Sequence, residues 1–285
     1  MAKLSDLILS NIKLSYFNIF LTLLILFVTN TNINANKPGN NIIRTGNNYI
    51  HPDSTYMIII DPGHGGKDKG TSYGKVYEKD ITLALAKKIK HAIEVNSSKA
   101  RVLLTRDDDS FIPLYERIRM ANRRGADIFI SIHCNSYAAN NEIHGNEIYV
   151  LGLTESGYNL DVAMRENASV LLERDYKNNY DWFDPNSIEA HIFLSAFQNM
   201  FLAQSLALAN NISNNLNQKS GIKTRGVKQA GFVLLKYATM PSILIETGFI
   251  SNYNDRKTLQ SEEGQNKIAE SIAEAVSEYI KRLQL

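Results

Sequence analysis

The sequence predicts an α/β fold, a single domain with a mixed, mostly parallel central sheet flanked by helices. Apolar runs of strand length alternate with segments whose apolar residues recur at helical spacing, which gives a β-α-β-α-β order. The continuously apolar run at 57–60 fits a strand buried on both faces. The chain has 285 residues, 44% of them hydrophobic, and no shift in composition marks a second domain.

The predicted elements follow one another without an internal repeat. In a helix over 79–95, Ile81, Leu85 and Ile89 share one face. Pro113 suits the first turn of a second helix. Strands are predicted at 56–61, 101–105, 127–133, 146–151, 232–235 and 242–246, and helices at 79–95, 113–124 and 264–283. Residues 152–198 are richer in Asn, Asp, Glu and Tyr, and we expect them to be inserted beside the core of a domain over 56–283.

The first 35 residues have the order of a signal peptide. Lys3 and Lys13 precede an apolar run at 16–28, and a small polar stretch with Ala35 follows it. The run is shorter than the roughly 20 apolar residues that span a bilayer, so a cleaved signal is favoured over an uncleaved anchor. The Asn-rich residues 36–55 are predicted to be a tether. With either kind of leader the protein is expected to be exported, to the periplasm or the cell envelope.

Charge and cysteine content exclude several classes of protein. The formal net charge is only +2, which gives no electrostatic footprint for nucleic acid. The single cysteine, Cys134, has no partner for a disulfide within the chain and is expected to be a small buried residue. We expect a monomer.

Polar residues follow three of the predicted strands at their carboxyl ends. His64 lies in a glycine-rich turn after the first strand, His133 closes the third, and Glu246 closes the last. Parallel strands bring such ends to one edge of a sheet, where α/β proteins bind ligands. Glu78 begins a helix shortly after His64 and is a fourth candidate.

Two histidines, a carboxylate and an open position are the ligand set of catalytic zinc. A second carboxylate would then carry the proton of an activated water. From the residues alone, Glu78 and Glu246 are interchangeable between these two roles. We expect the glycines around His64 to give a substrate close access to the metal.

Six segments of the chain carry a resemblance to a known family. They are D-P-G-H-G-G (61–66), E-K-D-I-T-L-A-L-A (78–86), L-L-T-R-D-D-D (103–109), R-R-G-A-D-I-F-I-S-I-H-C-N-S (123–136), R-G-V-K-Q-A-G-F (225–232) and S-I-L-I-E-T-G-F-I-S-N (242–252). Together they closely resemble the zinc-dependent N-acetylmuramoyl-L-alanine amidases of the Amidase_3 type, in the family's order from about residue 56 to 283.

The resemblance implies an activity and a role for each candidate residue. It makes His64, Glu78 and His133 the ligands of one zinc ion per chain, and Glu246 the catalytic carboxylate. The implied reaction is hydrolysis of the amide between N-acetylmuramic acid and the L-alanine of the stem peptide, during wall remodelling and daughter-cell separation. Asn135 and Arg225 are candidates for holding the substrate, since stem peptides carry carboxylates that arginine grips well.

Alternatives stay open for activity and regulation. A zinc carboxypeptidase or endopeptidase acting on stem peptides would use a similar ligand set, and a catalytically silent wall-binding module is a third reading. Some relatives carry an inserted helix whose glutamate blocks the zinc until an activator displaces it. Residues 156–172, with Glu155, Glu166 and Glu173 in and around them, would be such a cover here. Because they lack an obvious apolar partner-binding run, autoinhibition is the less favoured expectation. The expected partners are peptidoglycan and an activator or septal protein.

Overall fold

The computed structural model describes residues 55–181, 183–196 and 200–283, all of which belong to one compact unit over 50–285. The predicted signal peptide and nearly all of the predicted tether lie outside the described residues. The strands are β1 (Tyr56–Pro62), β2 (Ser72–Tyr73), β3 (Val76–Tyr77), β4 (Ala100–Leu104), β5 (Ile128–Asn135), β6 (Asn146–Leu151), β7 (Thr224–Ala230) and β8 (Ser242–Phe249).

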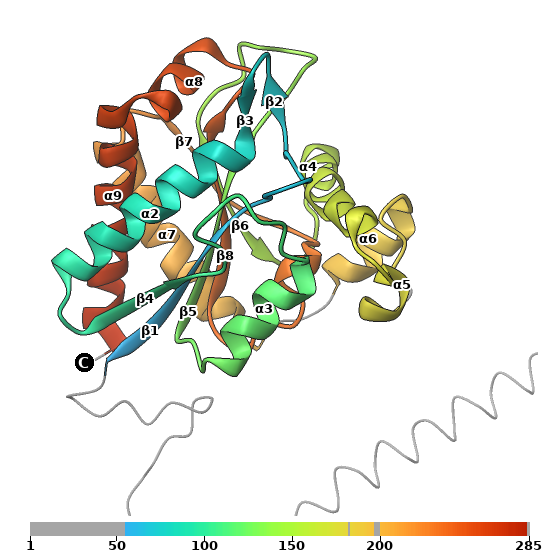
Figure 1. Cartoon of the computed structure of the whole chain (residues 1–285), viewed down its shortest axis with the longest axis horizontal. Coiled ribbons are helices and arrows are strands. Elements are labelled where there is room, and N and C mark those ends of the chain that lie inside the picture. The colour runs from blue at the N-terminus through green and yellow to red at the C-terminus, as the bar shows by residue number, and fades with distance from the viewer. Residues whose placement is uncertain (1–54, 182, 197–199, 284–285) are drawn as a thin grey trace, which may run out of the picture. The chain divides into compact units, whose positions relative to one another are not determined.

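Helices connect and cover these strands (Figure 1). They are α2 (Glu78–Asn96), α3 (Leu114–Arg123), α4 (Gly157–Asn167), α5 (Tyr176–Asn179), α6 (Ile188–Ser195), α7 (Leu202–Lys219), α8 (Tyr253–Gln260) and α9 (Glu262–Leu283), with short 3-10 helices η1 (Ala168–Leu172) and η2 (Val233–Leu235). None of the helices in the described part of the chain is long and apolar enough to cross a membrane.

The predicted α/β class is confirmed, with one mixed, mostly parallel sheet of order β4-β1-β5-β8-β6-β7. Strands β4, β1, β5 and β8 run parallel, whereas β6 runs antiparallel to β8 and parallel to β7. The carboxyl ends of β1, β5 and β8 therefore meet the amino ends of β6 and β7 at one edge of the sheet. We call this edge the site edge.

Two apolar layers lie on opposite faces of the sheet. Alternate side chains of each strand enter opposite layers, as Ile58 and Ile60 do on one face and Ile59 on the other. Helices α2, α7 and α9 cover the first face, and α3, α4 and α6 contribute to the second. The region over 152–198 is therefore packed on the sheet by part of its own apolar surface.

One predicted strand is wrong. Residues 232–235 do not pair in the sheet; they contain the buried 3-10 helix η2, and the strand before β8 is β7. A short apolar run fits a buried turn as well as a strand, so sequence pattern alone does not separate the two. Strand β7 was missed because it is an outermost strand of the sheet and is only partly buried. Its apolar signal in the sequence is therefore weak.

Candidate metal centre and active site

Two buried guanidinium groups hold the turn that carries His64. Strand β1 ends at Pro62, and His64 has φ of 60°, a conformation that residues with a side chain rarely adopt. Arg106 donates to the carbonyls of Pro62 and Gly63, and Arg117 donates to those of Pro62 and His64. These hydrogen bonds fix the unusual backbone and with it the direction of the imidazole.

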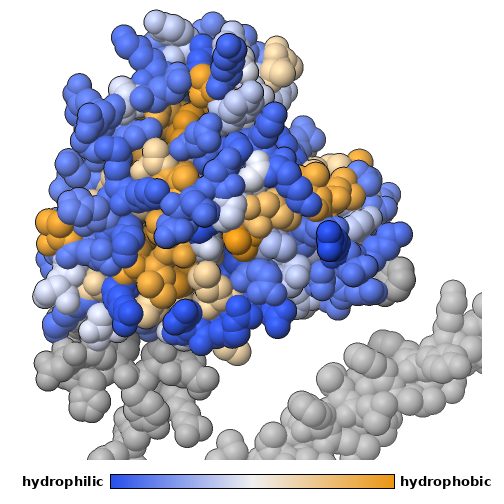
Figure 2. Space-filling view, viewed as in Figure 1, coloured by the Kyte–Doolittle hydropathy of each residue, from blue (hydrophilic) through white to orange (hydrophobic). Residues whose placement is uncertain are grey.

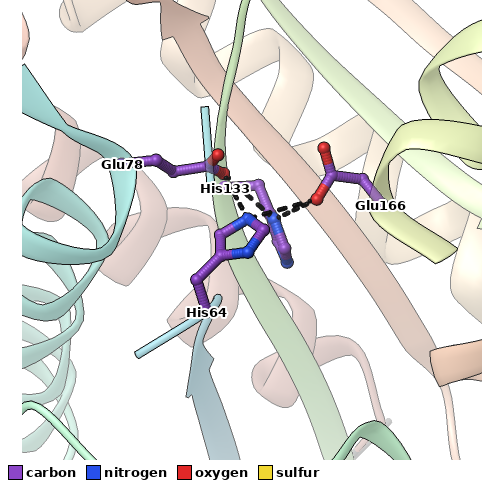
Figure 3. A group of neighbouring side chains, drawn as sticks. All are labelled: His64, Glu78, His133 and Glu166. Atoms are coloured by element: carbon purple, nitrogen blue, oxygen red, sulfur yellow. Dashed lines mark hydrogen bonds and ion pairs between the residues drawn. The ribbon is translucent and has the colours of Figure 1, made fainter. Parts of the chain in front are cut away.

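Four buried side chains converge at the site edge: His64, Glu78 and His133 from the core of the fold, and Glu166 from α4 (Figure 3). Their potential ligand atoms all lie within 4.8 Å of one another. Nε2 of His64 lies 3.0 Å from Oε1 of Glu78 and 3.3 Å from Oε2 of Glu166. Nδ1 of His133 lies 3.1 Å and 3.0 Å from the same two oxygens.

This arrangement is compact enough for the four side chains to share one metal ion. Two ligand atoms that are each about 2.0–2.1 Å from zinc lie about 3.3 Å apart at tetrahedral angles, and the four distances between a histidine nitrogen and a glutamate oxygen are close to that value. Nε2 of His64 and Oε2 of Glu166 are buried and make no hydrogen bond to a described residue. Both atoms instead form ion pairs within the cluster, and a shared metal ion would satisfy them in place of those pairs.

Neighbouring groups orient the predicted ligands from behind. Nδ1 of His64 hydrogen-bonds to Oδ2 of Asp68 at 2.9 Å, which leaves Nε2 directed into the cluster. The Glu78 carboxylate accepts hydrogen bonds from the backbone N–H of Cys134 at 2.9 Å and from that of Thr71 at 2.8 Å. Such outer partners reduce the freedom of the ligands before any metal arrives.

Two glycines make room for the cluster. A Cβ on Gly63 would lie 2.5 Å from the ring of His133, and one on Gly70 would lie 2.5 Å from the Glu78 carboxylate and 2.6 Å from His64. The expectation that the turn glycines make room for substrate is therefore wrong for Gly63, because the ring of His133 fills the space that a side chain at Gly63 would need.

Burial and charge act against each other on the titrating groups of the cluster. Burial alone would lower the pKa of His133, but the carboxylates of Glu166 and Glu78 outweigh it and raise the pKa to about 10. Burial would raise the pKa of Glu166, yet the two histidines hold that pKa well below its ordinary value. The metal-free cluster is therefore a set of ion pairs between protonated imidazoles and carboxylates.

Glu246 lies beside this cluster and outside its ion pairs. It is fully buried and in register with His133 on β5 and with Glu147 on β6. Neither carboxylate oxygen accepts a hydrogen bond from a described residue, and Nη2 of Arg165 lies 3.8 Å away. Burial, followed by the charges of Glu166 and Glu78, raises the pKa of Glu246 well above its ordinary value. A carboxyl group in this environment can take up and release a proton.

The two predicted substrate residues also reach the site edge. Asn135 ends β5, where its Oδ1 accepts from Arg165 at 2.8 Å and its Nδ2 donates to Glu147 at 3.0 Å. Arg225 is the second residue of β7 and donates from Nε to Glu147 at 2.6 Å. The side chain of Asn135 is therefore already hydrogen-bonded to Arg165 of α4 in this structure. Contact of either residue with substrate stays a prediction.

Sequence reasoning did not single out Glu166 as a member of the cluster. It lies four residues after the buried Val162 and three after the buried Ala163, so it shares the packed face of α4 with them. A glutamate on an apolar helix face was the available signal. The direct neighbour Arg165 and the nearby Ser169, which donates to Asp68 at 2.7 Å, extend the same contact surface.

Comparison with known proteins assigns the family. Residues 58–278 match the Amidase_3 family model, described as N-acetylmuramoyl-L-alanine amidase. AmiC of Escherichia coli O6:H1 is 33% identical over 231 residues, which cover 80% of this chain and 53% of AmiC. AmiA of Escherichia coli K12 is 33% identical over 230 residues, which cover 78% of this chain and 75% of AmiA. The chain therefore belongs to the N-acetylmuramoyl-L-alanine amidase family, a family of hydrolases.

Solved structures share the fold. The N-acetylmuramoyl-L-alanine amidase of Clostridium difficile 630 superposes with a TM-score of 0.59 at 26% identity, over 80% of this chain and 98% of that one. The catalytic domain of CwlV from Bacillus (Paenibacillus) polymyxa superposes with a TM-score of 0.58 at 28% identity, over 80% and 99% of the two chains. The chain spans about half the length of AmiC.

Proposed function

We propose that this protein is an exported, zinc-dependent amidase that cleaves the bond between N-acetylmuramic acid and the L-alanine of the stem peptide. The observation that carries the proposal is the buried cluster of His64, Glu78 and His133 with Glu246 buried beside it and free of hydrogen bonds from described residues. Membership of a peptidoglycan amidase family supports the substrate class. We further propose a role in cell-wall remodelling and daughter-cell separation.

In this proposal His64, Glu78 and His133 hold the metal. When bound there, zinc would polarise the scissile carbonyl and lower the pKa of a water molecule. Glu246 accepts the proton of that water and then delivers it to the alanine nitrogen as the amide bond breaks. Asp68 keeps the His64 ring oriented through the reaction.

Helix α4 supplies the fourth member of the cluster, Glu166, and we interpret this arrangement as a closed state. Oε2 of Glu166 takes the position that water or the scissile carbonyl would need, because it contacts both histidines within 3.3 Å. Arg165 at the same time engages Asn135. We therefore propose that α4 inhibits the enzyme and has to move before substrate binds, which is the expectation that the sequence favoured less.

The insert carries a surface suited to an activating partner. Ile188, Ile192 and Phe193 of α6 are 50%, 55% and 75% exposed, and Figure 2 shows apolar side chains gathered over the insert among hydrophilic neighbours. The first two lie one helical turn apart and share a face. One solved relative, the CwlD amidase of Clostridioides difficile, is in complex with the GerS lipoprotein. We propose a protein activator that binds this insert.

Product analysis tests the proposed reaction. Purified sacculi are incubated with the zinc-loaded Glu166→Ala variant, and the released material is analysed by mass spectrometry. Intact stem peptides with free L-alanine amino ends are expected. Cleavage within the peptide would instead identify a carboxypeptidase or endopeptidase, and binding without any release would identify a wall-binding module.

A further inference from the structure

A basic pocket of about 470 Å³ lies at the site edge, away from the metal cluster. It is lined by His144, Lys223, Thr224, Arg225 and Lys228. Thr224, Arg225 and Lys228 belong to β7, and His144 lies in the loop just before β6. Since β6 and β7 begin where β5 and β8 end, the pocket and the cluster of His64, Glu78 and His133 lie at the same end of the strands.

The cations of this pocket have more donors than the fold uses. The buried Glu147 carboxylate pairs with both Arg225 and Lys228 through its Oε1. Arg225 reaches it through Nε, and no described residue accepts a hydrogen bond from either terminal nitrogen of this guanidinium. For Lys223, too, the described part of the chain supplies no carboxylate partner. A forked guanidinium with two available donors matches a carboxylate.

The spacing between the pocket and the catalytic groups fits a short peptide. Strand β7 lies two positions from β8, which carries Glu246, and three from β5, which carries His133. At about 4.8 Å per strand these are separations of about 10 to 15 Å. An extended peptide covers that distance in about three or four residues. A peptide cut at its first amide would thus place a carboxylate of its following residues in the pocket.

Tyr158 of α4 contacts two of these cations, Lys228 and Arg225, in the closed state. Its ring lies 4.5 Å from Nζ of Lys228 and 5.8 Å from the guanidinium carbon of Arg225, both measured to the ring centroid. Its hydroxyl donates to Glu147 at 2.9 Å. One helix therefore contacts the cluster of His64, Glu78 and His133 through Glu166 and two cations of the pocket through Tyr158, so its departure would release both sets of residues.

We propose that the pocket of His144, Lys223, Thr224, Arg225 and Lys228 is a carboxylate subsite that binds the acidic peptide part of the substrate, and that Tyr158 competes with this peptide for Arg225 and Lys228 while α4 is docked. The proposal rests on the proposed amidase function. It gives Arg225 the specific role of a bidentate carboxylate ligand and assigns Lys223, which no motif had indicated, to the same site.

Peptide binding tests the subsite without requiring turnover. The probe is a synthetic tetrapeptide that begins with L-alanine and has free carboxylates, compared with the same peptide after those carboxylates are amidated. Affinities are measured by isothermal titration calorimetry on the Glu166→Ala protein, in which the blocking carboxylate is absent. The acidic peptide is expected to bind about 10-fold to 100-fold more tightly, as charge-assisted hydrogen bonds imply.

Further variants locate this preference in the pocket. In the same background, Lys223→Ala combined with Arg225→Gln should remove most of it, Tyr158→Ala should increase affinity for the acidic peptide, and the exposed Lys281→Ala in α9 should change neither. Equal affinity for the two peptides, no detectable binding of either, or an equal loss in the Lys281 control would overturn the proposal. Carboxylate-dependent binding with no release of L-alanine amino ends from sacculi would instead reject the amidase function and keep the subsite.

Discussion

Nε2 of His64 lies 3.3 Å from Oε2 of Glu166, so a carboxylate of helix α4 contacts a predicted metal ligand in the turn that follows β1. Both side chains are only 5% exposed. This pair joins the catalytic half of the fold to the segment that covers it, and it provides the most direct test of the closed state.

Replacing Glu166 with alanine should increase amidase activity. The change removes the side chain that holds α4 against both histidines, so a larger fraction of molecules is open and accessible to substrate. We expect an increase in kcat/KM on the order of 10-fold or more, measured by release of peptides from purified sacculi with zinc present. The matched control is Asp161→Ala, an exposed acid on the same helix; an equal increase in that variant would contradict inhibition by Glu166.

Substitutions of Glu246 and Glu78 should distinguish a catalytic role for Glu246 from a metal-ligand role for Glu78. In the Glu166→Ala background, Glu246→Gln should lower kcat by about 10²-fold to 10⁴-fold, because the proton carrier is lost, with one zinc retained per chain. Glu78→Gln should lose zinc as well as activity. Metal content is measured by inductively coupled plasma mass spectrometry. A Glu246→Gln protein without zinc, or a Glu78→Gln protein with full zinc, would reverse the two roles.

The metal-free protein should lose stability as the pH rises. The pKa of His133 is raised from an ordinary 6.5 to about 10 because the nearby carboxylates outweigh the effect of burial. Folding therefore strengthens proton binding, and the resulting stabilisation is complete below about pH 6.5 and lost as the pH rises through 10. Urea unfolding at a series of pH values should show this decrease. The Glu166→Ala variant, which lacks the largest charge acting on His133, should show a shallower one; an identical slope would argue against the ion pairs.

Arg117 should be a major contributor to stability. Its guanidinium donates to Asp61 at 2.9 Å and to the turn that carries His64, and both charged side chains are almost completely buried. Arg117→Met leaves the Asp61 carboxylate buried without its cation, so we expect a loss of about 3–5 kcal/mol in the free energy of unfolding. Arg119→Met, at a 60% exposed position of the same helix, should cost less than about 0.5 kcal/mol. Comparable losses in the two variants would rule out a special role for the buried pair.

The sequence predicted the elements that position most of the site. Continuous apolar runs indicated the strands that carry His133 and Glu246, because a strand covered on both faces has to be apolar on both. A glycine-rich turn and the start of a helix located His64 and Glu78 near each other, since only a short stretch of chain separates them. The structure brings His64, Glu78 and His133 into one cluster, although their function as zinc ligands stays a prediction.

The sequence by itself determined the α/β class and the order of the main strands along the chain, because local periodicity specifies these features. It left Glu78 and Glu246 as alternative catalytic carboxylates, and the family resemblance favours Glu246. Only the tertiary structure decided that β6 and β7 turn their amino ends toward the cluster of His64, Glu78 and His133, that Glu166 of α4 contacts this cluster, and that Tyr158 of the same helix reaches Glu147. Strand direction and the docking of an inserted helix depend on packing between residues far apart in the chain. Neither leaves a periodic signal at the residues that end up in contact.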